Sequence, residues 1–267
     1  MNDGQLPDTT LSIDVYAHRG STVLAPENTM RAFELALGLG ADVLEIDVRL
    51  SRDAQVIVTH DARVDRTCNH SGAVADMTLG QLKRLDAAYH FCDLQGRAHR
   101  GQGVGLITLD ELFERFPGTR INIDIKDNAP QAAQAVANSI DRASARDRVN
   151  VGSFHAPALR HFRRQAPEVS TAASQQEVAQ LYFFGKRRAH PLAYQYLQIP
   201  TSYYGIPLAA PGFMQRARQR NINLVYWTIN DTATMAHLVE RGAHGIVTDR
   251  VDLACSLLGK SKLDNPT

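Results

Sequence analysis

The sequence has few cysteines, no long apolar run and almost no net charge. Cys68, Cys92 and Cys255 are odd in number, widely spaced and form no CxxC pair, which argues against a disulfide or zinc framework and indicates reduced thiols. No apolar run approaches the roughly 20 residues that a membrane-spanning helix needs. With 29 Lys and Arg against 28 Asp and Glu, no bulk electrostatic field attracts nucleic acid, and we expect no nucleic-acid partner. Any specificity for anions must therefore be local.

The N-terminus also lacks the pattern of a secretory signal. MNDGQLPDTT is polar and acidic, with no basic region followed by an apolar stretch. Together with the cysteines, this pattern predicts a cytoplasmic protein. Hydrophobic residues make up 44% of the chain, which is enough to bury a substantial core. We expect one domain over residues 14–256, between an N-terminal tail at 1–13 and a C-terminal tail at 257–267.

Short β-branched runs alternate with amphipathic segments along the chain. Nine runs are candidate strands: 14–20, 42–50, 55–61, 121–126, 149–154, 169–174, 197–200, 223–230 and 245–249. Between them, Thr78, Thr108 and Ser174 each begin a segment with the spacing of a helical capping box. Alternation of this kind predicts a parallel α/β fold, and a closed (β/α)8 TIM barrel is the best match in size.

A barrel of this type needs eight strands, so one candidate has another role. Only SRDA separates the second run from the third, which is too short for a crossover between parallel strands. These two runs are expected to form a β-hairpin excursion after strand 2. A turn about Asp53 and Ala54 would place Asp47 opposite His60. Residues 62–107 are expected to form a small loop-rich insertion with one helix before strand 3.

Polar side chains occupy strand positions that a barrel normally fills with branched apolar residues. Alternation along a strand puts Glu45 and Asp47 on one face, and it does the same for Asp124 and Lys126. These residues fall near the carboxyl ends of strands, the rim where barrel enzymes place their chemistry. The alternative is a structural ion-pair network in which Lys126 and Arg19 neutralise the acids.

The residue types at this rim suit one kind of chemistry. Three converging carboxylates suit a hard divalent cation such as Mg²⁺ or Ca²⁺, with Mn²⁺ as a further option. His18 and His60 end strands beside acidic neighbours and suit proton acceptance and donation near neutral pH. Arginine and lysine suit contact with phosphate oxygens. Hydrolysis of a phosphodiester needs all of these parts, because the phosphate charge must be neutralised while one proton is removed and another is supplied.

Short motifs follow one another in a fixed order: HRG (18–20), PENT (26–29), EIDV (45–48), HD (60–61), an acid-x-Lys strand (124–126), WTIN (227–230) and GIVTD (245–249). This series resembles the glycerophosphodiester phosphodiesterase family from about residue 14 to residue 252. The ordered series is far more specific than any single motif. The resemblance implies a TIM barrel with a small insertion after the HD motif.

The resemblance also implies roles for eight residues: acid–base catalysis by His18 and His60, phosphate contact by Arg19 and Lys126, an aromatic pocket wall by Trp227, and binding of one divalent cation by Glu45, Asp47 and Asp124. The implied reaction is hydrolysis of glycerophosphodiesters to an alcohol and glycerol 3-phosphate. The third acidic ligand is usually glutamate in this family. Asp124 is therefore a departure that leaves the identity of the metal open.

Two alternatives concern the substrate and the activity. FPGTRINIDIK (116–126) resembles the lysophospholipase D branch of the family, which implies lysophospholipid substrates. LYFF (181–184), followed by GKRR, and SYYGIPLAAPGF (202–213) are apolar segments that could hold an acyl chain. LYFFGKRR could also make weak contact with a membrane surface, although ordinary helix packing is the simpler interpretation. From another functional class, a catalytically silent barrel would only bind phosphorylated ligands.

Overall fold

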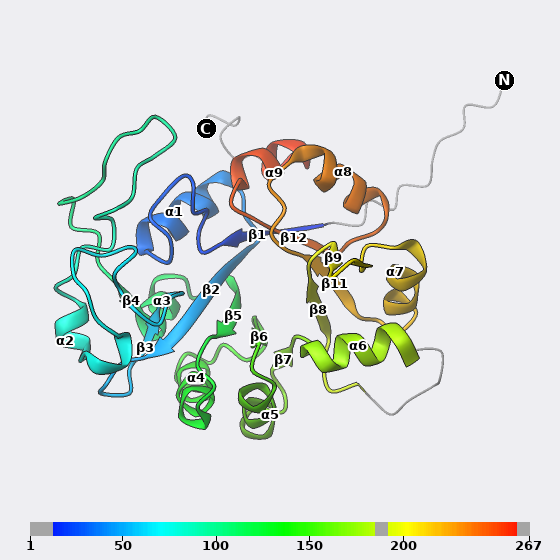
Figure 1. Cartoon of the computed structure of the whole chain (residues 1–267), viewed down its shortest axis with the longest axis horizontal. Coiled ribbons are helices and arrows are strands. Elements are labelled where there is room, and N and C mark those ends of the chain that lie inside the picture. Colours follow the sequence, from blue (N-terminus) through cyan, green and yellow to red (C-terminus); the bar gives the residue numbers. More distant parts are fainter. Residues whose placement is uncertain (1–12, 185–191, 261–267) are drawn as a thin grey trace.

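The computed structural model describes residues 13–184 and 192–260, in which parallel strands form a barrel surrounded by helices (Figure 1). The barrel strands are β1 (Asp14–His18), β2 (Val43–Leu50), β5 (Arg120–Ile125), β6 (Val149–Gly152), β7 (Ser170–Thr171), β8 (Tyr196–Ile199), β11 (Asn223–Tyr226) and β12 (Gly245–Thr248). They pair in the order β7–β6–β5–β2–β1–β12–β11–β8. A parallel bridge between Ala172 and Tyr196 joins the two ends of this series, so the barrel is closed. The predicted (β/α)8 barrel is confirmed.

The barrel strands are connected through helices that cover its outer surface (Figure 1). These helices are α1 (Met30–Leu39), α3 (Leu109–Arg115), α4 (Pro130–Arg142), α5 (Ala156–Gln165), α6 (Gln175–Phe184), α7 (Pro211–Arg218), α8 (Thr232–Glu240) and α9 (Val251–Leu257). The capping boxes predicted at Thr78, Thr108 and Ser174 are all present as reciprocal hydrogen bonds. Within the described ranges, no helix is long and apolar enough to cross a membrane.

The hairpin after β2 is confirmed, but its predicted register is wrong by one residue. β3 (Val56–Val58) pairs antiparallel with β2, and the Thr59 N–H donates to the Asp47 carbonyl at 2.9 Å. Asp47 therefore lies opposite Thr59 rather than His60. The Ser51 N–H donates to the Gln55 carbonyl, so the loop has an odd number of residues and ends on Ala54 in the left-handed region (φ 58°). The prediction assumed a turn with two central residues.

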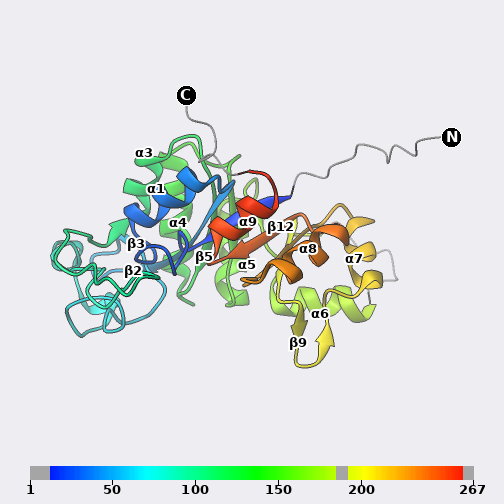
Figure 2. The same cartoon turned by 90° about the horizontal axis from the view of Figure 1, so that it is seen from above.

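The insertion is a folded element beside the barrel rather than an open loop. It contains η1 (Val74–Asp76), α2 (Leu79–Leu82) and β4 (Ile107–Thr108), and β4 pairs with β3. A separate apolar cluster that includes Val64, Val74 and Leu82 holds it together. The prediction of one helix missed the 3₁₀ turn and the short strand. Figure 2 shows the insertion on one side of the barrel and a second excursion, the β9 (Ser202–Tyr203) and β10 (Ile206–Pro207) hairpin, on the other.

Candidate active site

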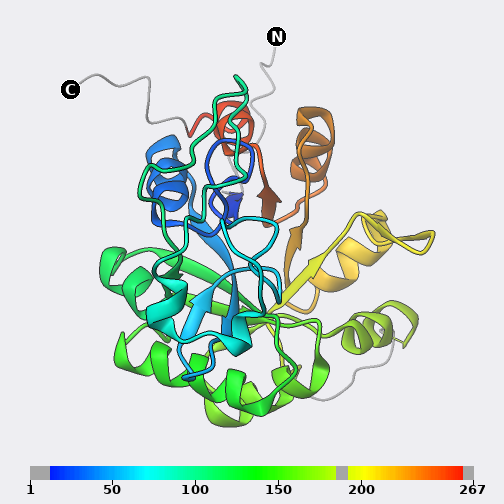
Figure 3. The same cartoon turned by 60° about the vertical axis from the view of Figure 1, so that its left-hand side comes forward.

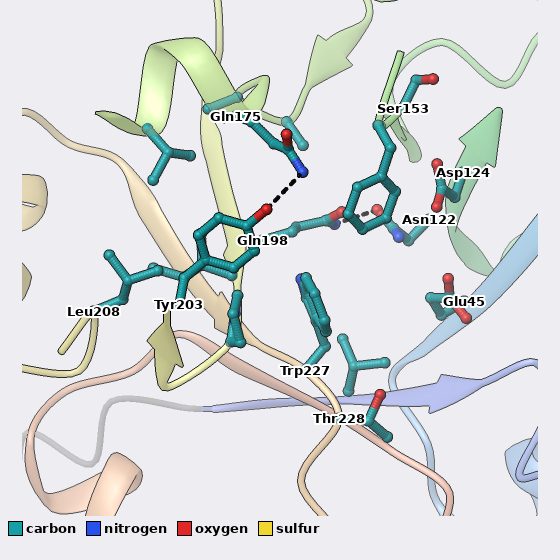
Figure 4. Close-up of a pocket in the computed structure, with 18 of the residues that line it drawn as sticks. Glu45, Asn122, Asp124, Ser153, Gln175, Gln198, Tyr203, Leu208, Trp227 and Thr228 are labelled. Atoms are coloured by element: carbon teal, nitrogen blue, oxygen red, sulfur yellow. Dashed lines mark hydrogen bonds between the residues drawn. The ribbon is translucent and has the colours of Figure 1, made fainter. Parts of the chain in front are cut away.

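All eight residues predicted for the site line one cavity of about 500 Å³. Figure 4 shows part of this cavity, with Glu45 and Asp124 on one side and Trp227 facing them. Alternation along β2 explains the placement, because Ile46 is buried in the main core while Glu45 and Asp47 turn into the barrel. Residues from widely separated parts of the chain therefore meet at one end of the strands, as predicted.

The loop after β1 is shaped by a glycine at which a larger residue would collide with α1. Gly20 has φ of 83°, and a Cβ atom placed there would lie 2.6 Å from the Ala32 Cβ. Arg19 before it is also left-handed (φ 50°), so the chain reverses within a few residues. The reversal lets the Arg19 backbone N–H donate to Glu45 Oε2 at 3.1 Å. The glycine of the HRG motif is thus required by the path of the chain.

Lys126 lies between two of the carboxylates. Its Nζ is 2.8 Å from Asp47 Oδ1 and 2.7 Å from Asp124 Oδ2. The other oxygen of Asp47 accepts a hydrogen bond from Asn28 Nδ2 at 3.0 Å. Burial opposes ionisation of Asp47, but the nearby Lys126 and Arg19 charges outweigh it and hold the pKa of this carboxyl below its usual value. Burial also opposes the charge on Lys126, yet Asp124 and Asp47 raise the pKa of its ammonium group.

The positive charges at this rim do not keep the pKa values of Glu45 and Asp124 at their usual level. Burial, followed by repulsion from Asp47, raises the pKa of Glu45 to about 7. Burial likewise raises the pKa of Asp124 despite its contact with Lys126. Asp124 Oδ1 is buried and has no hydrogen-bond partner among the described residues. An unsatisfied buried carboxylate oxygen is costly, so this atom is an available ligand for a cation.

The fit of a divalent metal ion to this rim is partial in this arrangement. The part of the chain that the structure describes has no ready-made cluster of three or more His, Cys, Asp or Glu side chains for a metal. Glu45 and Asp124 fit a hard cation, because they offer carboxylate oxygens and one of these is unsatisfied. Asp47 fits only if Lys126 releases Oδ1, since both of its oxygens are already engaged.

Arg19 offers a donor for an anion at the same rim. Its Nε is 3.0 Å from Asp47 Oδ2, close enough for an ion pair. This Nε is nevertheless buried and makes no hydrogen bond to any part of residues 13–184 and 192–260, because the geometry is poor. Arg19 also lines the cavity, beside the position where a phosphate would bind. Contact of Arg19 with phosphate stays a prediction.

Each predicted catalytic histidine is held by a carboxylate. His18 Nδ1 is 2.6 Å from Asp249 Oδ1, and His60 Nδ1 is 2.7 Å from Asp61 Oδ1. An ionised carboxylate only accepts hydrogen bonds, so each Nδ1 donates, and Nε2 of each ring is left for proton transfer. Burial works against the charge on His18, but the Asp249 hydrogen bond and the Glu45 charge raise the pKa of its imidazole.

These two carboxylates and Asn28 contact the predicted site residues but were not themselves predicted from the sequence. Asp61 and Asp249 lie in the HD and GIVTD motifs, and Asn28 lies in PENT. An acid directly after a histidine, or at the end of the last strand, is a signal that could have identified the first two. Asn28 donates to Asp47 Oδ2 from a left-handed backbone position (φ 55°), which the sequence does not reveal.

The rest of the cavity is an apolar lobe between α6 and the β9–β10 hairpin. Trp227 and Phe154, which both line the cavity, meet edge to face with ring centroids 5.9 Å apart. Apolar side chains of both predicted segments line it: Tyr182, Phe183, Tyr203, Ile206 and Leu208. Gln175 Nε2 and Tyr203 Oη lie 3.5 Å apart across the lobe (Figure 4).

The side chains of the LYFF segment differ in burial. Leu181 packs into the core, as ordinary helix packing predicts, whereas Phe183 is 61% exposed at the mouth of the cavity. GKRR lies outside the described residues. Phe183 is therefore placed to contact a bound ligand or a surface as well as the protein.

Comparisons with known proteins agree with this geometry. The sequence matches the glycerophosphoryl diester phosphodiesterase family over residues 18–253. A glycerophosphodiester phosphodiesterase of Caldanaerobacter subterraneus is 31% identical over 92% of this chain and 98% of its own length. A human lysophospholipase D is 26% identical over 87% of this chain and 82% of its own. The crystal structure of a glycerophosphodiester phosphodiesterase from Agrobacterium tumefaciens, 26% identical, superposes with a TM-score of 0.77 over 92% of this chain and 100% of that one. The chain belongs to the glycerophosphoryl diester phosphodiesterase family.

Proposed function

We propose that this protein is a metal-dependent phosphodiesterase that hydrolyses glycerophosphodiesters to an alcohol and glycerol 3-phosphate. The observation that supports this most strongly is the pair of imidazoles, each fixed by a carboxylate, in the cavity that also holds Arg19 and Lys126. A protein that only bound phosphate would need the cations but not two oriented proton carriers. The two oriented imidazoles therefore favour an enzyme over a catalytically silent barrel that only binds phosphorylated ligands.

In the proposed reaction, one imidazole removes the proton of the substrate's neighbouring glycerol hydroxyl, which attacks phosphorus, and the other protonates the alkoxide that leaves. Water then opens the resulting cyclic phosphate to give glycerol 3-phosphate. Arg19 and Lys126, which both line the cavity, neutralise charge on the non-bridging phosphate oxygens. Glu45, Asp47 and Asp124 would hold one Mg²⁺, Ca²⁺ or Mn²⁺ ion, which would supply further positive charge when bound. The assay that tests this proposal measures glycerol 3-phosphate released from glycerophosphocholine in the presence of a divalent ion. Absence of release under all three metals would refute it.

A lysophospholipase D activity is a second candidate, favoured by the apolar lobe. A glycerophosphodiester with a small headgroup is polar throughout and gains little from Leu208, Ile206 and Phe183. An acyl chain in the same lobe would gain roughly 0.8 kcal/mol for each buried methylene group. Comparing kcat/KM for glycerophosphocholine and lysophosphatidylcholine decides between the two. A clear preference for the acylated substrate would favour the second candidate.

A further inference from the structure

Arg66 of the insertion contacts two carboxylates at the rim of the site through all three of its guanidinium nitrogens. Nη1 and Nη2 donate to the two oxygens of Glu27, each at 2.7 Å. Nε donates to Asp61 Oδ2 at 2.6 Å. Planar guanidinium groups favour such bidentate contacts, which fix geometry as well as charge. One side chain thus ties the insertion to the loop after β1 and to the segment after β3.

Both carboxylates in turn hold a residue of the site. Asp61 uses its other oxygen, Oδ1, for His60 Nδ1 at 2.7 Å. Glu27 Oε1 also accepts from Arg19 Nη1 at 3.1 Å. The chain of contacts therefore runs from Arg66 to the imidazole on one side and to the phosphate-binding guanidinium on the other. Figure 3 shows the insertion on the near side of the barrel, beside the loop between β1 and α1.

The backbone around His60 is already fixed without Arg66. Arg49 Nε donates to the His60 carbonyl at 2.8 Å, and β3 ends two residues before this histidine. These contacts do not fix the direction of the imidazole ring. Asp61 sets that direction. Asp61 is partly exposed and adjacent in sequence, so it can rotate unless its second oxygen is held. Arg66 holds that oxygen.

We propose that Arg66 is a positioning residue for the proposed phosphodiesterase reaction, orienting His60 through Asp61 and Arg19 through Glu27. The inference rests on the function proposed above for this cavity. The insertion (residues 62–107) thereby takes part in positioning the site, because its Arg66 side chain joins the loop after β1 to the segment after β3. Hydrogen bonds from Arg66 also help to hold the pKa values of Glu27 and Asp61 below their usual values, although burial opposes both shifts. Both acceptors therefore remain charged near neutral pH.

The inference is tested with Arg66→Ala, Arg66→Lys and the matched control Arg63→Ala. Arg63 is a neighbouring exposed arginine that pairs with Asp65. We expect Arg66→Ala to lower kcat by about tenfold or more through His60 and to raise KM several-fold through Arg19. Arg66→Lys keeps the positive charge but loses the planar guanidinium that contacts both carboxylates, so its kcat and KM should remain impaired. Arg63→Ala should behave as the wild type.

Substitution of Asp61 or Glu27 alone separates the effect on kcat from the effect on KM. Asp61→Asn should reproduce mainly the fall in kcat, and Glu27→Gln mainly the rise in KM. Added guanidinium ion should partly restore kcat in Arg66→Ala, but a folding defect would not respond. Wild-type values of kcat and KM for Arg66→Ala, or full activity of Arg66→Lys, would overturn the proposal.

A measurement without substrate separates failure of this inference from failure of the proposed function. Nitrogen NMR of the His60 ring, assigned with His60→Gln, reports which nitrogen carries the proton. We expect a fixed Nδ1–H tautomer in the wild type and in Arg63→Ala, and a mixture of tautomers in Arg66→Ala. An unchanged tautomer in Arg66→Ala would overturn the proposed positioning role of Arg66, even in a protein that hydrolyses no glycerophosphodiester.

Discussion

His18 Nδ1 lies 2.6 Å from Asp249 Oδ1, although 231 residues separate the two in sequence. The contact exists because the first and last barrel strands, β1 and β12, pair with each other. Asp249 is fixed in turn by Thr22 Oγ1 at 2.6 Å and by Asn230 Nδ2 at 2.8 Å. The orientation of the His18 ring therefore depends on the pairing of the first and last barrel strands.

Replacing Asp249 with Asn should change the pH profile in a defined direction. The hydrogen bond and the charge of Asp249 raise the pKa of His18 against the effect of burial, so their loss lowers that pKa. We expect kcat of Asp249→Asn to fall by about tenfold or more. In the metal-loaded enzyme, the limb of the kcat–pH profile that reports His18 should move to lower pH. A shift of the acidic limb would identify His18 as the base, and a shift of the alkaline limb would identify it as the acid. A profile with both limbs unmoved would contradict this role of Asp249.

Removal of divalent ions should abolish hydrolysis. EDTA is expected to stop turnover, and Mg²⁺, Ca²⁺ or Mn²⁺ should restore it. Because Asp124 Oδ1 is the unsatisfied oxygen, Asp124→Asn should raise the metal concentration for half-maximal activity by roughly tenfold. Metal should also raise the melting temperature of the wild type more than that of Asp124→Asn. Asp110→Asn, which changes a surface ion pair with Arg142, serves as the control. Full activity in chelator would exclude a metal role.

Narrowing the apolar lobe should affect acylated substrates selectively. Ala179 on α6 lines the lobe, so Ala179→Trp removes space from an acyl chain. We expect kcat/KM for lysophosphatidylcholine to fall by roughly tenfold, while the value for glycerophosphocholine stays within about twofold. Gln180→Trp, one position along the same helix, controls for the bulk of the new side chain. Equal losses on both substrates would show that the lobe does not hold the chain.

Two glycines near α1 should respond in opposite directions to alanine. Gly20→Ala forces a Cβ atom to within 2.6 Å of Ala32 at a positive φ, and we expect about 2 to 4 kcal/mol of destabilisation. Gly38 lies within the helix with nothing within 4 Å of its Cβ position, so Gly38→Ala should stabilise by about 0.5 to 1 kcal/mol. Urea denaturation measures both. A neutral Gly20→Ala would show that the loop relaxes.

The sequence predicted the barrel well because its strands carry strong local signals. Alternation placed Glu45 and Asp47 on the cavity side and Ile46 in the core, and both placements are confirmed. Capping boxes marked helix starts through interactions within four residues. The hairpin register failed because it depends on a backbone choice, the left-handed Ala54, that alternation does not encode.

Local sequence patterns could not predict the contacts between residues that lie far apart in the chain. The eight predicted site residues do line one cavity, but the pairing of Lys126 with Asp47 and Asp124 leaves the expected three-carboxylate metal site only partly available. Asp249 and Arg66 act on the site through other side chains. Nothing in the spacing of the insertion marks Arg66, because its partners lie in two other loops.

The reaction itself is tested most directly by phosphorus NMR of glycerophosphocholine incubated with the wild type and with His18→Ala in the presence of a divalent ion. We predict that the wild type converts the diester signal into that of glycerol 3-phosphate. His18→Ala should be slower by about 10² or more while keeping the unfolding midpoint of the wild type. Phosphocholine as the product, or near-normal turnover by His18→Ala, would contradict the proposed reaction.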